Sequence, residues 1–579
     1  MPEERTTLID SLRINARELG NANGILYYDT PQSSTYRGYA DLDLRARAIA
    51  DALVKRGYRV GQTVTIGLTS GIDWADAAWG VLYAGLAFVP APVAGFGTGS
   101  ELGQRIGDIA RAAGASVFLS DGGVIDRLGD GDDSLGVPAV LLADLLADGD
   151  PEQWTPPAIN ADSIAYLVFT SGSTGEPKGV ISTHGTVSGF ADAVAELWGL
   201  DREGTLVGWA PMHHIMGLLA QVIIPGANGT KAVVTSIEQF QRRPVVWLQM
   251  ISRHQGTATA AGNFAFALVT QMVTDQQLAE LDLSSLKVMF TGSEPVRADT
   301  VRAFLDRFAP AGIRGDMIAP TMGMTEATAY AGKYPGEAMV VRRFDRAAIE
   351  SGELIPAEGP GSVEAVSCGR PIKDTTVVIV DPHTLMPVPD GTIGEIWVAS
   401  PMVSPGYFRR PDATAETFGQ QLPGSEEAFM RTGDLAAILD GELFVTGRLK
   451  EVINVRGRNL YPQDIEAAAR LVSPAVGFGA AFELDGHPSA VGTVLEYNEE
   501  TLAQSGHSID KLAGRVRDAL VKNISLPSLG VAFVTEGSLP RTSTGKVRRA
   551  LTRTMLENGD LSTAHSSGFR QHPGNGPTE

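Results

Sequence analysis

The stretch that decides the fold reads Tyr166-Leu-Val-Phe-Thr-Ser-Gly-Ser-Thr-Gly-Glu-Pro-Lys-Gly-Val180. Its first four residues form an apolar strand that runs directly into a loop of Thr, Ser and Gly, with Lys178 near the end. Small residues let the backbone fold tightly, so that N–H groups and hydroxyls converge on an anion. The loop is not a Walker A motif, because Pro177 stands where that motif, counted from Gly172, needs a glycine. A surface turn would have a similar composition, but the preceding strand and the lysine favour a phosphate-binding loop.

Composition restricts the function classes. A chain of 579 residues is too long for one hydrophobic core, so two or more domains are expected. The formal net charge of −20 argues against a nucleic-acid partner, which would require a basic face. The single cysteine, Cys368, excludes an internal disulfide and fits a reducing cytoplasm, and a packed, inert thiol is favoured over a nucleophile. With no apolar signal region and no run of about 18 apolar residues, a soluble, intracellular protein without a transmembrane segment is expected.

Residues 35–150 alternate between helix-like and strand-like segments. Asp41 is placed to cap a helix whose apolar residues follow helical spacing and which Gly57 ends. A Gly/Ala-rich helix is expected over residues 77–87. Short apolar strands are expected at residues 63–68, 88–93, 116–119 and 139–142. This alternation predicts an α/β fold in which helices cover both faces of parallel strands.

A second junction of strand and loop lies at residues 286–296. An apolar strand enters the turn Gly292-Ser293-Glu294-Pro, and ligands bind beyond the carboxyl ends of strands in such folds. The alternative is a helix start, with Ser293 as the N-cap and Glu294 favoured by the helix dipole. The residues fit both interpretations.

The second half of the chain changes character. Residues 331–370 are charged and rich in Gly and Pro, and loops of this length are usually functional or disordered. A small β-rich subdomain and a small α+β domain are expected to follow. From residue 561 onward, Ser, Gly, His and Pro predict a disordered tail. The strands are expected at residues 376–380, 394–399, 475–482, 491–495 and 530–534, with a helix at 508–521.

The loop at residues 170–180 also resembles the phosphate loop of the adenylate-forming enzymes, which include acyl-CoA synthetases, luciferases and peptide-synthetase adenylation domains. Further motifs follow in that family's order across residues 35–555. They are Trp209-Ala-Pro-Met-His-His214-Ile-Met-Gly-Leu, Met322-Gly-Met-Thr-Glu326, Arg431-Thr-Gly-Asp434, Gly447-Arg448-Leu-Lys450 and Leu539-Pro-Arg-Thr-Ser-Thr-Gly-Lys546. Residues 331–370 and 454–466 resemble the fatty acyl-AMP ligases, which carry an insertion that plain acyl-CoA synthetases lack. The chain is identified as a member of that group.

The resemblance implies a site for ATP and Mg²⁺. Lys546 would bridge the substrate carboxylate and the α-phosphate, Thr325 would approach that phosphate, and Glu326 would ligate Mg²⁺, which prefers oxygen ligands. His214 would line the wall between the acyl pocket and the nucleotide, and Lys450 would be the hinge. The residues implied in ATP or AMP binding are Thr170, Ser171, Gly172, Ser173, Thr174, Gly175, Lys178, Gly292, Ser293, Glu294, Met322, Gly323, Met324, Asp434 and Arg448.

Two residues depart from the family's pattern. Met322 stands where the family has an aromatic residue against adenine, and since a thioether can still pack on a purine, weaker stacking is expected. Ile215 replaces the aspartate usual in fatty acyl-AMP ligases. Taken alone, His214 is also typical of a structural histidine, Asp434 of a turn residue and Lys546 of an exposed turn lysine.

The resemblance implies a large N-terminal domain of mixed and parallel sheets layered with helices, with a small β-rich subdomain (1–447), a hinge (448–452), a mobile α+β lid (453–560) and the tail (561–579). It also implies ATP-dependent activation of a medium- or long-chain fatty acid to acyl-AMP, with release of pyrophosphate. Transfer to the phosphopantetheine of an acyl carrier protein would follow, for polyketide, nonribosomal peptide or lipid biosynthesis. The alternatives are an acyl-CoA synthetase that uses free CoA and a catalytically silent nucleotide-binding or scaffold protein.

Overall fold

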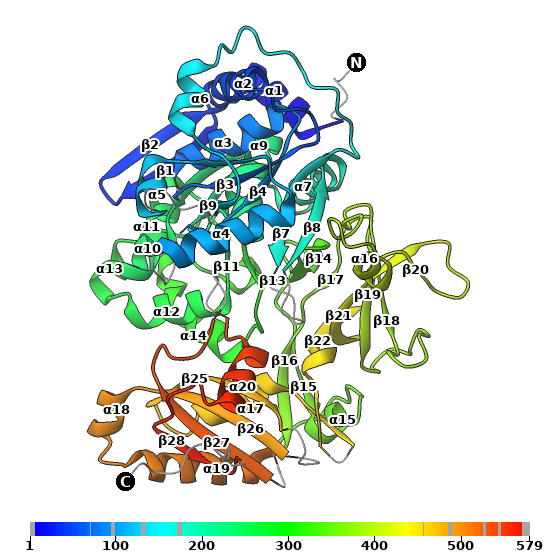
Figure 1. Cartoon of the computed structure of the whole chain (residues 1–579). Helices are drawn as coiled ribbons and strands as arrows, with labels where there is room; N and C mark the ends of the chain where they lie inside the picture. Colours follow the sequence, from blue (N-terminus) through cyan, green and yellow to red (C-terminus); the bar gives the residue numbers. More distant parts are fainter. Residues whose placement is uncertain are drawn as a thin grey trace.

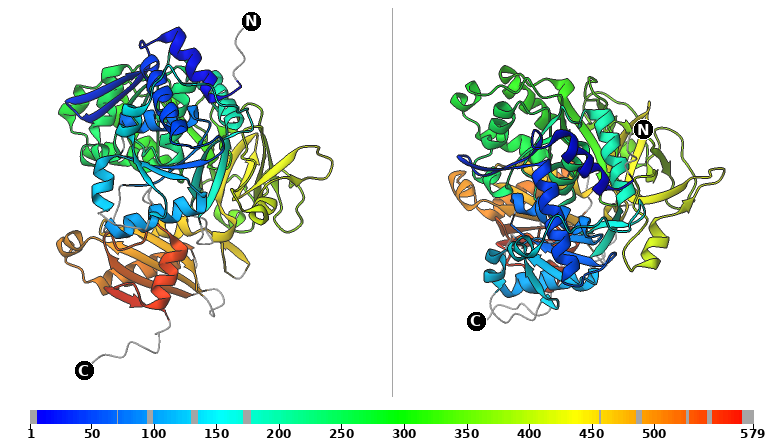
Figure 2. Two further views of the ribbon diagram at one scale, coloured as in Figure 1. Left: turned by 45° about the horizontal axis from the view of Figure 1, so that its top comes forward. Right: turned by 90° about the horizontal axis from the view of Figure 1, so that it is seen from above.

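The structure is a computed structural model. It describes residues 6–69, 71–93, 99–128, 135–170, 177–455, 457–484, 490–524, 528–541 and 546–569. A large layered unit carries a β-rich unit at its side and a small C-terminal unit at its base (Figure 1). In Figure 1 the C-terminal unit lies below α12 (Asn263–Met272) and α14 (Ala298–Phe308), and the left view of Figure 2 again shows it at the base of the large unit.

Two sheets form the large unit. The nine-stranded sheet has the order β17-β14-β13-β12-β11-β9-β10-β1-β2 and is parallel from β13 through β1. The six-stranded sheet has the order β6-β5-β3-β4-β7-β8 and is parallel except for β8. The strands of the first sheet are β1 (Gly24–Thr30), β2 (Ser33–Gly38), β9 (Thr205–Gly208), β10 (Lys231–Thr235), β11 (Ala258–Ala261), β12 (Val288–Thr291), β13 (Ile318–Met324), β14 (Thr328–Gly332) and β17 (Arg370–Pro371). Those of the second are β3 (Thr63–Gly67), β4 (Ala87–Pro90), β5 (Val117–Ser120), β6 (Ala139–Leu141), β7 (Ile164–Thr170) and β8 (Lys178–Thr183).

Helices cover both faces of each sheet. Because alternate strand residues point to opposite faces, Leu206 of β9 joins the core between the two sheets, whereas Val207 joins the outer core. On β5, Leu119 likewise joins the core between the sheets, whereas Phe118 joins the outer core of the second sheet. The inner helices are α1 (Leu8–Leu19), α2 (Tyr39–Lys55), α3 (Ile72–Tyr83), α6 (Leu142–Asp148), α7 (His184–Trp198) and α9 (Ile224–Asn228). The outer helices are α10 (Ile237–Arg242), α11 (Val245–His254), α12 and α14 on the first sheet, and α4 (Gly99–Ala113) and α5 (Gly122–Leu128) on the second.

The β-rich unit is built around an antiparallel sheet. Its order is β18-β19-β21-β20, and β22 pairs with β21. The region at residues 331–370, expected as a long loop, is partly regular: β15 (Val341–Asp345) and β16 (Ser362–Val366) form a hairpin with α15 (Arg346–Glu350) between them. Phe344 of this insertion packs edge-on against Phe444, which explains why this region forms regular structure. The strands are β18 (Thr376–Val380), β19 (Gly394–Ala399), β20 (Gln420–Gln421), β21 (Ala428–Leu439) and β22 (Glu442–Arg448), and α16 spans Pro411–Thr417.

The C-terminal unit has its own sheet and cores. The sheet order is β25-β26-β27-β28, with α17 and α19 on one face and α20 on the other. The prediction of disorder from residue 561 is wrong for residues 561–569, because His565–Ser567 forms the edge strand β28 and Phe569 packs against the sheet. The elements are β23 (Ile453–Val455), β24 (Arg458–Leu460), α17 (Pro462–Arg470), β25 (Val476–Glu483), β26 (Ala490–Tyr497), α18 (Glu499–Gln504), α19 (Ile509–Ile524), β27 (Ser528–Thr535) and α20 (Arg549–Asn558).

The predicted fold class is confirmed, and each predicted strand is present with small shifts at its ends. The helix predicted at residues 77–87 is α3, which begins five residues earlier and ends at Tyr83. Two predicted N-caps are wrong. The N-cap of α2 is Gly38, so Asp41 lies in the first turn, where its charge favours the helix dipole. The N-cap of α14 is Arg297, so Ser293 caps no helix. In the part of the chain that the structure describes, no helix is both long and apolar enough to cross a membrane.

Candidate active site

The two ends of the predicted phosphate loop face each other across a hairpin. Thr170 ends β7, Lys178 begins β8, and the two residues are paired in the antiparallel register. Residues 171–176, which include Ser171, Gly172, Ser173, Thr174 and Gly175, lie outside the described ranges. The Lys178 Nζ lies 4.8 Å from the centroid of the Tyr407 ring. The hairpin therefore fixes where the loop begins and ends.

The turn after β12 lies at the carboxyl end of the nine-stranded sheet, where a ligand was expected. A Cβ on Gly292 would come within 2.7 Å of the Thr321 carbonyl oxygen, so only glycine fits there. Ser293 has a φ of +65°, which turns the chain sharply. The Glu294 carboxylate accepts a hydrogen bond from the Phe264 N–H at 2.7 Å. Burial raises its pKa, against the opposing charges of Lys546 and two arginines.

A second turn, Thr325–Ala327, joins β13 to β14 at the same end of the sheet. Glu326 in this turn is 7% exposed, and burial raises the pKa of its carboxyl group. The Tyr407 hydroxyl donates to Glu326 Oε1 at 3.0 Å. Met322, Met324 and Thr325, together with the exposed Gly323, form the end of β13 and the turn, and the two methionines pack against the core of the β-rich unit.

Asp434 on β21 has one carboxylate oxygen with no hydrogen-bond partner in the described structure. Its side chain is buried, and Oδ1 accepts a hydrogen bond from Arg448 Nε at 2.9 Å. Oδ2 is buried without a hydrogen-bond partner among the described residues. Burial raises the pKa of Asp434, while Arg448 opposes this. A buried carboxylate oxygen without a partner is costly, and a ribose hydroxyl would satisfy it.

Lys546 reaches this group from the C-terminal unit. The residue is exposed, but the protein atoms around its amine lower its pKa, and the charge of Arg448 lowers it further. Glu294, Asp434 and Glu451 oppose the shift and are therefore close in space. One lysine of the C-terminal unit thus lies near acidic groups from three separate segments of the chain.

His214 lies beside Lys546. It is the N-cap of the short helix α8 (Ile215–Leu218), where its Nδ1 accepts from the Met216 N–H at 3.3 Å. Burial, followed by Lys546, lowers its pKa to about 4, so the imidazole is neutral at pH 7. Ile215 packs against the core between the two sheets, which an aspartate at this position would not do.

Lys450 is exposed and lies in the short 3₁₀ turn Leu449–Glu451, between β22 of the β-rich unit and β23 of the C-terminal unit. Beside it, Glu451 accepts a hydrogen bond from Arg549 Nη1 at 2.7 Å. Arg549 also pairs with Glu466 at 2.6 Å. The residue proposed as the hinge therefore lies where the chain passes from one unit to the other.

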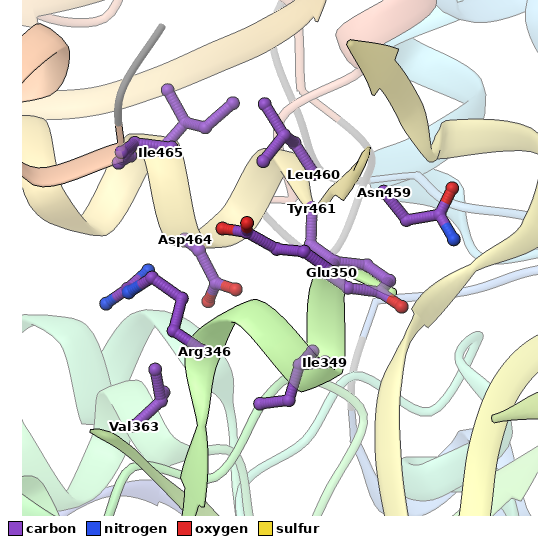
Figure 3. Close-up of a pocket in the computed structure, with 10 residues that line it drawn as sticks. Arg346, Ile349, Glu350, Val363, Asn459, Leu460, Tyr461, Asp464 and Ile465 are labelled. Atoms are coloured by element: carbon purple, nitrogen blue, oxygen red, sulfur yellow. The ribbon is translucent and has the colours of Figure 1, made fainter. Parts of the chain in front are cut away.

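The insertion touches the C-terminal unit at a small pocket, which the sequence did not reveal. Arg458 Nε donates to the Glu350 carboxylate at 2.7 Å, and the Glu350 side chain is only 9% exposed. Figure 3 shows Glu350, Arg346 and Asp464 around the same pocket. Burial raises the pKa of Asp464, against the charges of Arg297 and Arg346. The Glu350–Arg458 ion pair thus links the insertion to the C-terminal unit.

Two other residues were not predicted. Tyr407 contacts both Lys178 and Glu326, although its sequence context is only a Gly-Tyr pair after a strand. Burial lowers the pKa of Arg105 on α4, and the charge of Arg548 lowers it further, so these two cations lie near each other. A lone arginine on an amphipathic helix gives no signal of such proximity.

The residues fit a nucleotide-bound Mg²⁺ better than a protein-held metal centre. Among the described residues, no group of three or more His, Cys, Asp or Glu side chains is placed to hold a metal ion. Glu326 offers one buried carboxylate, and Mg²⁺ is usually bound through one or two carboxylates together with substrate phosphates.

The comparisons with known proteins agree with this geometry. Residues 16–408 match the family model described as AMP-binding enzyme. Medium-chain-fatty-acid–[acyl-carrier-protein] ligase JamA of Moorena producens is 35% identical over 573 residues, which cover 96% of each chain. The 4-hydroxyphenylalkanoate adenylyltransferase of Mycobacterium tuberculosis is 35% identical over 508 residues, or 85% of this chain and 81% of the relative.

A solved structure is similar over the whole chain. The fatty acyl-adenylate ligase from L. pneumophila, in complex with acyl adenylate and pyrophosphate, has a TM-score of 0.74 and 29% identity, covering 97% of this chain and 98% of its own. The protein therefore belongs to the AMP-binding enzyme family, and its identification from sequence as a fatty acyl-AMP ligase of the adenylate-forming superfamily is confirmed.

Proposed function

We propose that the enzyme joins a medium- or long-chain fatty acid to the AMP moiety of ATP and then passes the acyl group to a carrier protein. In the first step, a carboxylate oxygen of the fatty acid forms a bond to the α-phosphorus. The bond from that phosphorus to the bridging oxygen breaks, and pyrophosphate leaves. The observation that carries the proposal is the buried Asp434, which Arg448 holds through Oδ1 at 2.9 Å and whose Oδ2 has no partner in the described structure. Lys546 is close enough to act on the pKa of Asp434, and from there its charge would bridge the substrate carboxylate and the α-phosphate.

Each residue is assigned a part in positioning or charge neutralisation, on which such transfers depend. Asp434 Oδ2 accepts a ribose hydroxyl, and Arg448 holds Asp434 in place. Lys178 and the loop from Thr170 hold the phosphates. Glu294 and the residues from Met322 to Met324 lie along the adenosine.

Glu326 would hold Mg²⁺, which neutralises phosphate charge when bound with ATP. Thr325 approaches the α-phosphate from the same turn. The neutral His214 forms part of the wall between nucleotide and acyl chain without adding charge.

In the second step, the thiol of a phosphopantetheine arm attacks the acyl carbonyl, AMP leaves, and the thiol proton passes to solvent. We propose an acyl carrier protein as the acceptor because the carrier-protein ligase JamA is similar over nearly the whole chain. The mobile lid at 453–560 would rotate about Lys450 between the steps. The one cysteine is consistent with work in a reducing cytoplasm.

Product analysis tests the proposal. The protein is incubated with ATP, Mg²⁺ and lauric acid, alone, with CoA or with a holo carrier protein, and the products are identified by mass spectrometry. We expect acyl-AMP in the first two reactions and acylated carrier protein in the third. Acyl-CoA would identify an acyl-CoA synthetase instead, and no pyrophosphate with any acid, including a 4-hydroxyphenylalkanoate, would identify a silent nucleotide-binding protein.

A further inference from the structure

Residues 404–408 connect two parts of the site through backbone hydrogen bonds. The segment runs beside β8, the strand that returns from the phosphate loop, and Val180 and Tyr407 form an isolated bridge. The bonds are Ile181 N to Gly406 O at 3.1 Å, Phe408 N to Gly179 O at 2.8 Å, and Ser404 N to Glu326 O at 2.8 Å. The position of Tyr407 is therefore set by the phosphate-loop hairpin and the Glu326 turn together.

The Tyr407 side chain contacts a charged group from each part. Its hydroxyl donates to Glu326 Oε1 at 3.0 Å, and Lys178 Nζ lies 4.8 Å from the ring centroid. Tyr407 and Glu326 are 8% and 7% exposed, so neither side chain can readily change its rotamer. A cation near the face of an aromatic ring is attracted to it. Tyr407 thus contacts both the Glu326 carboxylate and the Lys178 ammonium group, at the part of the site that would hold the phosphates.

We propose that Tyr407 is a positioning residue for MgATP. Its hydroxyl occupies Oε1 of Glu326 and leaves Oε2 for Mg²⁺, and its ring holds Lys178 beside the phosphate loop until the nucleotide arrives. The assignment presupposes the adenylation activity proposed above.

The chemistry favours this role over simple packing. A ligating carboxylate is usually fixed by hydrogen bonds from neighbouring groups, and losing such a partner typically weakens metal affinity or activity about 10- to 100-fold.

Tyr407→Phe tests the hydroxyl because it keeps the ring beneath Lys178. The matched control is Tyr330→Phe, because Tyr330 is buried in the same apolar cluster and its hydroxyl has no partner in the described part of the chain. Mn²⁺ replaces Mg²⁺, and its binding to the protein with α,β-methylene-ATP is followed by electron paramagnetic resonance. We expect the dissociation constant for Mn²⁺ to rise about 10- to 100-fold in Tyr407→Phe and to change less than about twofold in Tyr330→Phe. Melting temperatures of both variants report on folding.

A double-mutant cycle shows whether Tyr407 acts through Glu326. In a Glu326→Gln background, Tyr407→Phe should weaken Mn²⁺ binding little further. Equal Mn²⁺ affinity in Tyr407→Phe and Tyr330→Phe, or an undiminished Tyr407→Phe effect in the Gln background, would overturn the assignment. If the wild type released no pyrophosphate in response to fatty acid, the proposed function would be overturned instead, and the Mn²⁺ measurement would still report on Tyr407.

Discussion

Replacing Asp434 with alanine should weaken nucleotide binding while leaving the free protein folded. The carboxylate is buried, and burial raises its pKa despite Arg448, so the folded protein gains little from its charge. The Arg448 side chain is 57% exposed and can turn to water when its partner is removed. The usual large cost of leaving a buried charge unpaired therefore does not arise.

The loss in binding follows from the free oxygen. Oδ2 has no partner in the described structure, so a ribose hydroxyl would add a hydrogen bond to a charged acceptor. Such a bond contributes about 1.5–3 kcal/mol, which corresponds to roughly a 10- to 100-fold rise in the KM for ATP. Asp434→Asn keeps one oxygen and should lose less.

Deoxynucleotides make the assay specific to this contact. Fatty-acid-dependent ATP–pyrophosphate exchange is measured for ATP, 2′-deoxy-ATP and 3′-deoxy-ATP with wild type and Asp434→Ala. The wild type should disfavour the deoxy analogue whose missing hydroxyl contacts Asp434, and the variant should accept it as well as ATP. Unchanged discrimination in Asp434→Ala would refute the ribose contact.

Three further results are expected. Burial lowers the pKa of His184 from 6.5 to about 4. Between these two pH values the unfolded state binds more protons than the folded state, so the free energy of unfolding should fall as pH falls from about 6.5 to about 4. Urea unfolding should show a shallower fall in His184→Gln, and an identical fall would contradict this role of His184. Glu350→Gln removes the 2.7 Å ion pair with Arg458 and should speed hydrogen exchange at residues 457–470, measured by mass spectrometry, while exchange unchanged from wild type would show that the pair does not link the units. Burial raises the pKa of the Cys368 thiol to about 12. Because the thiolate is the reactive form, iodoacetamide should label native protein much more slowly than unfolded protein. Equal labelling rates would show an accessible thiolate in the native protein.

Much of the layered fold was predictable from local sequence. Short apolar strands separated by amphipathic helices specify parallel sheets, because helices must cover both faces of such strands. In such a sheet the turns with Gly292 and Glu326 both lie at the carboxyl ends of neighbouring strands, where ligands bind. The roles proposed for Asp434 and Lys546 came from the resemblance and not from local pattern, since an aspartate or lysine in a turn is common.

What the sequence did not reveal depends on contacts between distant segments. Tyr407 acquires its two partners only because residues 404–408 lie beside β8, more than 200 residues earlier in the chain. The insertion is ordered by Phe444 and by Arg458, which lie outside it. The strand at residues 565–567 forms because β27 offers an unpaired edge, although its own composition suggests disorder.

Fatty-acid-dependent ATP–pyrophosphate exchange by wild type and Lys546→Ala is the most direct test of adenylate formation at this site. Lys511→Ala, a change at an exposed lysine on α19 of the same unit, is the control. Loss of one preorganised charge that stabilises the transition state costs on the order of 10²–10³ in rate. We therefore expect exchange to fall by at least about 10² in Lys546→Ala, with unchanged melting, and to persist in Lys511→Ala. Wild-type exchange by Lys546→Ala would contradict the account.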